Sequence, residues 1–523
     1  MHLKFIIPLI FGLIANQGEC ARIFGAFLFP SYSHQVIFQP IWKELSLRGH
    51  QVTVITPNPL NDPKLTNLTE IDISFTYKLP VFAQMMSGLQ SANSVFKKEL
   101  GTYFLFTEVY EAVMNYAPVR DIVNNQNDHY DLVLLQYNHI AHGMLPFAHK
   151  YKAPLIGLSS MGVYLQIHDA LGNPTHPVVN PDYMMGLSGE MSFFERMQSL
   201  LFNFWYRAVY YWYFLPNSDK LARKYFGNDI PYLGDIERNT SLVMMSCNPL
   251  INSVVPNVPN LIEISQMHIR EKKPLPKDIK QYLDSSPQGV VYFSLGSNVK
   301  SANLTQDLRK TIISALSELP YNVLWKWEAD SLPDQPKNVM VRKWLPQPDV
   351  LGHKNIKVFF MQGGLQSLEE SINNEVPVVG MPFFSDQPAN MRKVVELGIG
   401  LMLDHRTVTK RNIVDSLKEV AENKKYKENV LKSKAILMDH PVRNASQAAW
   451  WIEYVLRHNG ARHMRSSAAD MTFFQYFMLD VVAFLLTCVI TVAYVLIKLL
   501  RVFKKLVVKD KSKKAGQKKA KKH

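Results

Sequence analysis

Cysteine is scarce in this chain of 523 residues, which contains only Cys20, Cys247 and Cys488. Cys20 ends an apolar N-terminal stretch and Cys488 lies in an apolar C-terminal run, so Cys247 stands alone in the region between them. A single cysteine there excludes an internal disulfide. The body must therefore be held together by its hydrophobic core, and the chain is long enough for two or more domains.

The chain also lacks a dispersed excess of positive charge. Its formal net charge is +14, but residues 498–523 hold twelve Lys and Arg against one acidic residue, Asp510, which accounts for +11. The remaining residues carry only +3. This distribution excludes a nucleic-acid-binding surface on the body and predicts a basic tail on a nearly neutral protein.

The N-terminal residues 1–20 combine Lys4, an apolar run over 5–14 and small residues at the end. This combination of a basic residue, a short apolar run and small residues before a cleavage site is typical of a secretory signal peptide. We expect the mature chain to begin near Ala21, in the secretory lumen.

Residues 473–497 form an apolar run long enough to span a bilayer, and basic residues follow it at once. This charge bias predicts a single-pass type I transmembrane helix with a cytoplasmic tail at 498–523. The last residues, Lys519 to His523, resemble a dilysine retrieval signal; contact of a polybasic tail with lipid is the alternative. We therefore expect a protein of the endoplasmic reticulum membrane with its body in the lumen. The glycosylation sequons lie on that side: Asn67, Asn239, Asn303 and Asn444.

Apolar segments alternate with helical patterns along the body, which is typical of α/β domains with parallel sheets. A strand over 23–29, a helix over 35–48 and a strand over 52–56 form a β-α-β unit. This unit places His34 at the carboxyl end of its first strand, where open α/β sheets bind ligands. The expected order is an N-terminal domain at 21–255, a linker at 256–285 and a C-terminal domain at 286–460, whose pattern predicts a six-stranded parallel sheet.

Residues 191–215 contain an unusual cluster of Phe, Trp and Tyr, together with Arg196 and Arg207. One interpretation is a helix that lies on the membrane surface. The other is an aromatic helix of the core or of a ligand pocket. The preceding residues 164–187 are rich in Pro, Gly and Asn and predict a loop.

The stretch from Val341 to Val394 has the pattern strand, loop, helix, strand, loop, helix. Residues 358–361 suit a buried parallel strand, and a helix is expected over 365–373. Gly363 and Gly364 come directly before that helix, where free backbone N–H groups and the helix dipole attract an anion. A second strand is expected over 376–380, and Asp386 is expected to cap the helix after it.

Three motifs in this stretch are the most specific in the chain: Trp344-Leu-Pro-Gln347, Gly363-Gly364 with Glu370, and Asp386-Gln387-Pro-x-Asn390. Their order and spacing resemble the signature of the UDP-glycosyltransferases, in particular the membrane-bound animal branch with an insect character. The resemblance covers nearly the whole chain. It implies an α/β protein of the GT-B fold, with two Rossmann-like domains facing a cleft and a C-terminal transmembrane helix.

The resemblance also implies roles for single residues. Trp344 would stack on uracil and Gln347 would bond to it, Glu370 would take the ribose hydroxyls, and the Asp386–Gln387 pair would take the sugar hydroxyls. The helix that follows the Gly pair would hold the diphosphate, which a loop after residue 293 would face. The donor site expected on these grounds comprises Ser294, Gly296, Ser297, Trp344, Gln347, Gln362, Gly363, Gly364, Gln366, Ser367, Glu370, Asp386, Gln387 and Asn390.

The implied reaction is an inverting transfer of a sugar from a UDP-sugar to a hydroxyl of a small lipophilic acceptor, with His34 as general base. Glucose is favoured over glucuronate because of the insect character. Neither a cofactor nor a metal is expected, since backbone amides and the helix dipole can neutralise the diphosphate. The oligomeric state is left open.

This sequence departs from the family pattern at three places. Gln136 stands where an acidic residue usually orients the histidine base, and Gln362 stands where a histidine usually touches the phosphates. Ser265-Gln266 replaces a Gly-Gly pair. These changes motivate a second hypothesis, a catalytically impaired member that binds UDP-sugars or lipophiles, or that acts as a partner of active relatives.

Overall fold

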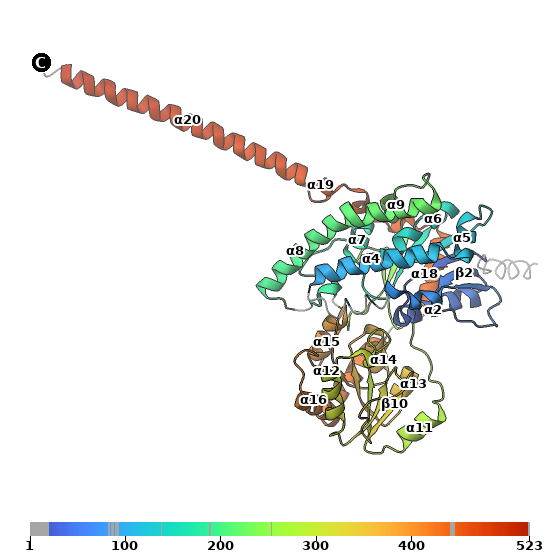
Figure 1. Cartoon of the computed structure of the whole chain (residues 1–523). Coiled ribbons are helices and arrows are strands. Elements are labelled where there is room, and N and C mark those ends of the chain that lie inside the picture. Colours follow the sequence, from blue (N-terminus) through green and yellow to red (C-terminus); the bar gives the residue numbers. More distant parts are fainter. Residues whose placement is uncertain are drawn as a thin grey trace, which may run out of the picture. The chain divides into compact units, whose positions relative to one another are not determined.

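The computed structural model describes residues 20–81, 84, 88, 94–137, 139–187, 190–252, 254–439 and 445–520 (Figure 1). The expected signal peptide up to residue 19, the sequon at Asn444 and the last residues of the tail lie outside this range. The chain divides into two compact units, Met1–Ser466 and Ser467–His523.

The first sheet has seven parallel strands in the order β3-β2-β1-β4-β5-β6-β7. The order reverses between β1 and β4, so the carboxyl ends of these two central strands form the edge at which open α/β sheets bind ligands. The strands are β1 Arg22–Ala26, β2 Gln51–Thr56, β3 Leu68–Asp72, β4 Leu132–Gln136, β5 Leu155–Ser159, β6 Leu242–Ser246 and β7 Leu261–Ile264.

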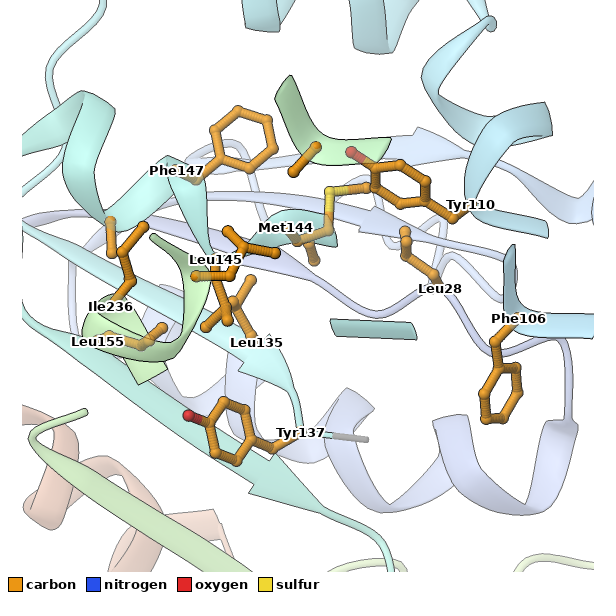
Figure 2. Close-up of a cluster of buried hydrophobic side chains, with 14 of the residues drawn as sticks. Leu28, Phe106, Tyr110, Leu135, Tyr137, Met144, Leu145, Phe147, Leu155 and Ile236 are labelled. Atoms are coloured by element: carbon orange, nitrogen blue, oxygen red, sulfur yellow. The ribbon is translucent and has the colours of Figure 1, made fainter. Parts of the chain in front are cut away.

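Helices cover both faces of this sheet. They are α2 Tyr32–Leu47, α4 Val95–Met114, α5 Ala117–Asn124, α6 Pro146–Tyr151, α7 Leu165–Leu171, α8 Phe193–Val209, α9 Leu215–Phe226 and α10 Leu233–Arg238, with a π-helical turn, η4 Tyr210–Phe214, between α8 and α9. On one face, Leu135 and Leu155 of the strands pack with Phe106 and Tyr110 of α4 and with Phe147 of α6 (Figure 2).

The second sheet has six parallel strands in the order β10-β9-β8-β11-β12-β13, as the sequence predicts. Its order reverses between β8 and β11. The strands are β8 Val290–Ser294, β9 Asn322–Lys326, β10 Val339–Arg342, β11 Ile356–Met361, β12 Val378–Gly380 and β13 Gly400–Met402. The helices are α11 Lys277–Asp284, α12 Gln306–Leu316, α13 Gln347–Leu351, α14 Leu365–Asn373, α15 Gln387–Glu396, α16 Lys410–Glu422 and α17 Lys424–Met438.

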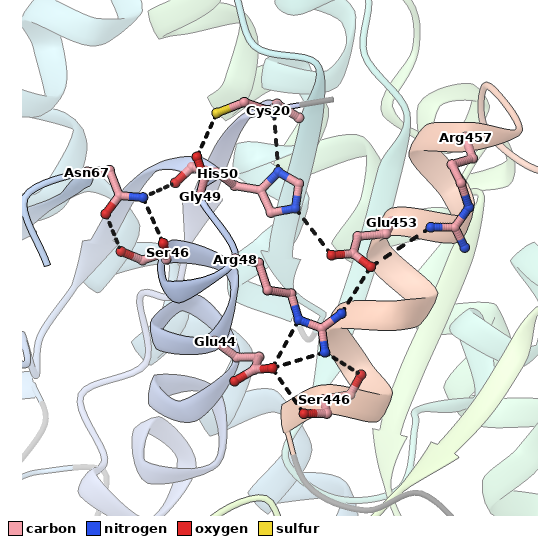
Figure 3. A network of polar contacts seen from close by, with 11 residues as sticks. Cys20, Glu44, Ser46, Arg48, Gly49, His50, Asn67, Ser446, Glu453 and Arg457 are labelled. Atoms are coloured by element: carbon pink, nitrogen blue, oxygen red, sulfur yellow. Dashed lines mark hydrogen bonds and ion pairs between the residues drawn. The ribbon is translucent and has the colours of Figure 1, made fainter. Parts of the chain in front are cut away.

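The helix after α17, α18 Ala445–Arg457, packs on the first sheet rather than the second. Its buried face, which includes Ala448 and Ile452, joins the core that α2 forms with the strands. Glu453 of α18 accepts a bond from Arg48 at 3.0 Å and lies 3.4 Å from a ring nitrogen of His50 (Figure 3). Sequence reasoning placed this helix within the C-terminal domain, and it placed β7, a strand of the first sheet, within the linker.

Two local expectations are wrong. Residues 164–187 are not all loop, because α7 lies among them and ends at Gly172, whose positive φ of 66° suits a glycine cap. The helix expected over 35–48 begins earlier, because α2 begins at Tyr32 and His34 lies in its first turn. Gly49 follows the end of this helix with a φ of 95°, a conformation that suits glycine.

The second unit contains α19 Phe473–Tyr476 and α20 Leu479–Ala520. Within α20, Leu479–Lys509 is long and apolar enough to cross a membrane. The helix begins later than the expected residue 473 because Met478, with a φ of 51°, separates α19 from α20.

Candidate functional site

A cavity of about 690 Å³ lies at the carboxyl ends of both sheets. Residues that follow β1, β4 and β5 line it from the first sheet, and residues that follow β8 and β11 line it from the second. Both points at which a strand order reverses therefore contribute to one site. Of the residues expected in the catalytic and donor sites, Gly363 and Asn390 do not line this cavity, and all the others do.

His34 reaches the cavity from the first turn of α2. Its Nδ1 forms a hydrogen bond with the hydroxyl of Ser160, directly after β5, and its ring lies edge-on to Phe29 at 4.7 Å. Within the described part of the chain, no carboxylate forms an ion pair with this ring. Burial against the surrounding protein lowers the pKa of His34 to about 4. The imidazole is therefore neutral at physiological pH and has a lone pair to accept a proton.

Gln136, at the end of β4, does not bond to the imidazole in place of the missing acidic residue. Its Oε1 accepts a hydrogen bond from the backbone N–H of Phe29 at 3.0 Å, and it thereby fixes the segment that leads from β1 to α2. Sequence reasoning missed Ser160 as the partner of His34. The only signal was that a polar residue, Ser159, ends β5 and a second, Ser160, directly follows it.

Ser160 also connects the two sheets. Its backbone carbonyl accepts a hydrogen bond from Gln366 Nε2 of α14 at 3.0 Å. The carbonyl of Gln366 in turn lies 3.0 Å from Nε2 of His268. Two further bonds cross the cavity nearby, Ser31 Oγ to Asn298 Oδ1 at 2.9 Å and Ser33 Oγ to Ser297 Oγ at 3.0 Å.

At the other end of the cavity, Trp344 presents a ring that is 56% exposed. Tyr32 meets this ring edge-on at 5.2 Å, and Nζ of Lys326 lies 5.5 Å from its centre. Gln347 donates to Glu370 Oε2 at 2.7 Å, and burial raises the pKa of Glu370 to about 7. Aromatic ring, amide and carboxyl thus lie together at this end of the cavity.

Glycines shape the middle of the cavity. Gly363 has a φ of 88°, and a Cβ there would lie 2.6 Å from Met391. Gly296 has a φ of 77°, and a Cβ there would lie 2.5 Å from Nε2 of Gln362. Both positions therefore require glycine, and they bring backbone close to the N-terminus of α14.

Gln362 brings a neutral amide to this place, and its buried Oε1 has no hydrogen-bond partner among the described residues. A cation lies close by: Lys326 donates to the carbonyl of Gly296 at 3.0 Å and to Glu328 at 2.7 Å. Sequence reasoning missed Lys326, since a lysine at the end of a strand is not distinctive.

Asp386 precedes α15 at the N-cap position, but its side chain does not bond to the first turn of that helix. Instead its Oδ2 accepts from Asn390 at 2.7 Å, and Asn390 also donates to the carbonyl of Gly363 at 2.9 Å. Burial raises the pKa of Asp386. Gln387 Oε1 accepts from the backbone N–H groups of Phe383 and Phe384, and Gln387 lines the cavity together with Asp386.

The third departure from the family pattern has a local consequence. Gln266 has a φ of 58°, a conformation that favours glycine, and it is held there by a bond from its Nε2 to the carbonyl of Leu437 at 2.7 Å. This bond ties the segment before His268 to the end of α17.

Residues 27–514 match the sequence profile of the family described as UDP-glucoronosyl and UDP-glucosyl transferase. The chain belongs to the UDP-glycosyltransferase family. UDP-glucosyltransferase 2 of Dactylopius coccus is 33% identical over 491 residues, which cover 93% of this chain and 94% of that relative. UDP-glucuronosyltransferase 2B7 of Homo sapiens is 30% identical over 507 residues, which cover 92% and 93%.

The same fold is found in solved structures. The glycotransferase of kitacinnamycin superposes with a TM-score of 0.54 at 20% identity, over 83% of this chain and 99% of that one. CalG4, the calicheamicin glycosyltransferase, superposes with a TM-score of 0.52 at 15% identity. The protein is thus a glycosyltransferase of the GT-B fold that uses a UDP-sugar as donor.

Proposed function

We propose that this transferase moves glucose from UDP-glucose to a hydroxyl of a small lipophilic acceptor, with inversion at the anomeric carbon. In this reaction the acceptor oxygen attacks the anomeric carbon on the side opposite UDP. The bond between that carbon and the diphosphate oxygen breaks, and the acceptor proton passes to His34. The observation that carries the proposal is a neutral imidazole held by Ser160 in the same cavity as the residues of the donor signature.

The charges around Asp386 favour a neutral sugar. In the described parts of the chain, no Lys or Arg pairs with Asp386, whose neighbours are Asn390, Ser385 and backbone. The carboxylate of a glucuronosyl group would meet this carboxyl without a compensating cation, and the repulsion between two like charges costs free energy. A glucosyl group offers hydroxyls that Asp386 and Gln387 can bind.

The apolar side chains near His34 favour a lipophilic acceptor. Phe29, Phe106, Tyr164 and Met184 line this part of the cavity. An aromatic or aliphatic body could be buried among them while its hydroxyl faces the imidazole.

The departing diphosphate needs positive charge or dipoles. We assign this task to the N–H groups at the start of α14, to Lys326 and to the amide of Gln362, with no metal ion. Because Gln362 is neutral, Lys326 carries the only formal charge in this set, which predicts slower turnover than a histidine at 362 would give.

We also propose that α20 anchors the protein in the membrane of the endoplasmic reticulum, with the body in the lumen. Asn239 and Asn303 are exposed and suit glycosylation. Asn67 does not, because its amide nitrogen donates to the carbonyls of Ser46 at 2.8 Å and His50 at 2.7 Å (Figure 3), and a glycan would replace one of these hydrogens. Endoglycosidase treatment should lower the apparent mass of the parent on a gel. Before treatment, Asn239→Gln and Asn303→Gln should each lower the apparent mass by one glycan, whereas Asn67→Gln should leave it unchanged.

The decisive experiment incubates microsomes that contain the full chain with labelled UDP-glucose or UDP-glucuronate and a panel of phenols. We expect transfer from UDP-glucose, a β-linked product by NMR, and loss of transfer in His34→Ala with unchanged UDP binding. Preferential use of UDP-glucuronate would refute the sugar assignment. UDP binding without transfer to any acceptor would instead support the impaired, binding-only hypothesis.

A further inference from the structure

Two neighbouring residues of α14, Glu369 and Glu370, have buried carboxyl groups, with exposures of 1% and 8%. Glu370 lines the cavity and receives the amide of Gln347, whereas Glu369 does not line it. Neighbouring positions of a helix do not face each other, so the two carboxyls have different surroundings. A buried carboxylate without a cation is costly. In the described part of the chain, the ion-pair partner of Glu369 is a histidine, His268, which follows β7.

The partners of His268 decide which of its ring nitrogens carries the hydrogen. Its Nε2 lies 3.0 Å from the backbone carbonyl of Gln366, which can only accept, so the hydrogen is on Nε2 and Nδ1 has a lone pair. This Nδ1 lies 3.7 Å from Oε2 of Glu369, and both atoms are buried without a hydrogen-bond partner among the described residues. A proton on Glu369 would satisfy both atoms once they approach to hydrogen-bond distance.

Burial decides the charge of this pair. It raises the pKa of Glu369 to about 8, against a bond from the backbone N–H of Gln266 and with a further contribution from the negative charge of Glu370. Burial also lowers the pKa of His268 to about 4. Near pH 7 the pair therefore consists of a carboxylic acid and a neutral imidazole.

The other titratable groups packed around the pair are anionic, uncharged or already paired. They are the Arg270–Asp349 pair, the pairs of Lys427 and Lys434 of α17 with Glu375, the carboxyl of Glu263, and the thiol of Cys247, whose pKa is raised by burial. Among the described residues, these groups supply no unpaired cation to Glu369. An ionised Glu369 would therefore be uncompensated.

The first turn of α14 connects this pair with the rest of the site. His268 bonds to the carbonyl of Gln366, and the side chain of Gln366 donates to the carbonyl of Ser160. Ser160 in turn holds His34. A shift of this turn would therefore move the base as well as Glu370, the carboxyl that is expected to face the ribose.

We propose that Glu369 and His268 are positioning residues of the donor site, in which Glu369 acts as an uncharged acid. Its O–H faces the lone pair of His268, the N–H of His268 holds the first turn of α14, and Glu370 is left as the single negative charge toward the ribose. When Glu369 loses its proton, a second negative charge lies beside Glu370 and repels the diphosphate of a UDP-sugar. Donor affinity therefore falls in alkaline solution. The proposal rests on the proposed donor site and is independent of which sugar is transferred.

The test measures the affinity of the full chain for UDP by calorimetry in phosphatidylcholine nanodiscs from pH 6.5 to 8.5. If bound UDP raises the pKa of Glu369 by about one, the affinity of the parent falls about threefold between pH 7 and 8.5. Glu369→Gln is uncharged at every pH and keeps a hydrogen-bond donor for His268, so its affinity should stay constant. Glu263→Gln is the matched control, because Glu263 of β7 also has a pKa raised by burial but lies outside this chain of contacts; it should show the fall of the parent.

The bond from His268 to α14 has its own test at pH 7. His268→Ala removes the N–H that the carbonyl of Gln366 accepts, and UDP affinity should fall. His268→Gln restores an N–H on a side chain of similar reach and should recover most of the affinity. Equal losses in the two variants would overturn the role of this bond.

Equal falls of affinity with pH in the parent and in Glu369→Gln would overturn the proposal. A loss in Glu369→Gln at pH 7 would overturn it as well, because the parent would then need a charged Glu369. The parent alone offers a further test, since calorimetry in two buffers of different ionisation enthalpy should show proton uptake when UDP binds at pH 8. Binding without proton uptake would contradict the proposal.

Glu370→Ala tests the donor site separately. Unchanged UDP affinity in this variant would refute the proposed donor site itself. A clear loss in Glu370→Ala, together with no effect of Glu369→Gln on the pH dependence, would refute only the positioning role of Glu369.

Discussion

The hydrogen bond between His34 and Ser160 makes a strong prediction, because Ser160 takes the place of the missing carboxylate. With Nε2 taken as the basic nitrogen, the N–H at Nδ1 of His34 would lose its acceptor in Ser160→Ala. An unsatisfied polar group of this kind costs about 1–3 kcal/mol. Since about 1.4 kcal/mol corresponds to a factor of ten, kcat/KM should fall roughly 5- to 150-fold. The bond from Gln366 to Ser160 uses the backbone and is retained, so UDP affinity should not change.

The pH profile adds a second readout. With a pKa of about 4, His34 is already deprotonated above pH 5, so the kcat/KM of the parent should be flat from pH 6 to 8 and fall only near pH 4. Ser160→Asp places a negative charge beside Nδ1 and should raise the pKa of His34. A histidine with a higher pKa stays protonated to higher pH, so the acid limb should move upward. Above that limb the base is stronger, and kcat should increase.

Ser159→Ala is the matched control, because the Ser159 hydroxyl donates to the carbonyl of Gly162 at 3.1 Å and does not touch His34. Rates are measured with labelled UDP-glucose and a phenol, and UDP affinity by calorimetry. The reasoning is refuted if Ser160→Ala keeps the kcat/KM and the pH profile of the parent. Equal losses in Ser159→Ala and Ser160→Ala would also refute it, because the loop after β5 and not the bond to His34 would then be responsible.

Three further predictions concern the donor site and stability. Trp344→Ala should weaken UDP binding by about 1–3 kcal/mol by calorimetry, by analogy with base stacking on aromatic residues, while Trp450→Ala, on α18, should leave it unchanged. Gln362→His should raise kcat more than UDP affinity, because its positive charge acts on the leaving group; equal kcat values in both proteins would contradict this. Glu99 has a pKa of about 8 through burial, so the folded state holds a proton that the unfolded state has lost above its ordinary pKa. The free energy of unfolding of the parent should therefore fall as pH rises from 6 to 8.5. This fall should be smaller in Glu99→Gln. The control Glu108→Gln, at an exposed position of α4, should show the same fall as the parent.

Much of the C-terminal half could be predicted from local patterns. The helix expected over 365–373 is α14, and the six-stranded parallel sheet follows from the alternation of apolar runs with helices. The motif residues cluster because they follow strands of one sheet, and parallel strands carry their carboxyl ends to one edge. Such predictions succeed where local chemistry alone decides the outcome.

The errors arise where tertiary contacts choose between locally equivalent options. The apolar pattern of α18 predicts a helix with a buried face but not the sheet that receives it. Gln136 ends β4 and Ser160 follows the neighbouring strand β5, so the sequence offers both as partners of the imidazole. The backbone N–H of Phe29 occupies the Gln136 oxygen and leaves the ring to Ser160. No local signal in the sequence records this competition.

Ser160 acts in two ways, and this explains how the base can work without a carboxylate. Its side chain orients the imidazole of the first domain, while its carbonyl receives Gln366 from the helix that faces the donor. The position of the ring is thus tied to the position of α14, and the Ser31–Asn298 and Ser33–Ser297 bonds brace the same junction. A carboxylate would add strength to the base but not this connection. In the mechanism that we propose, the geometry of the His34 base therefore depends on contact between the two sheets, and its placement against the donor would compensate for its weakness as a base.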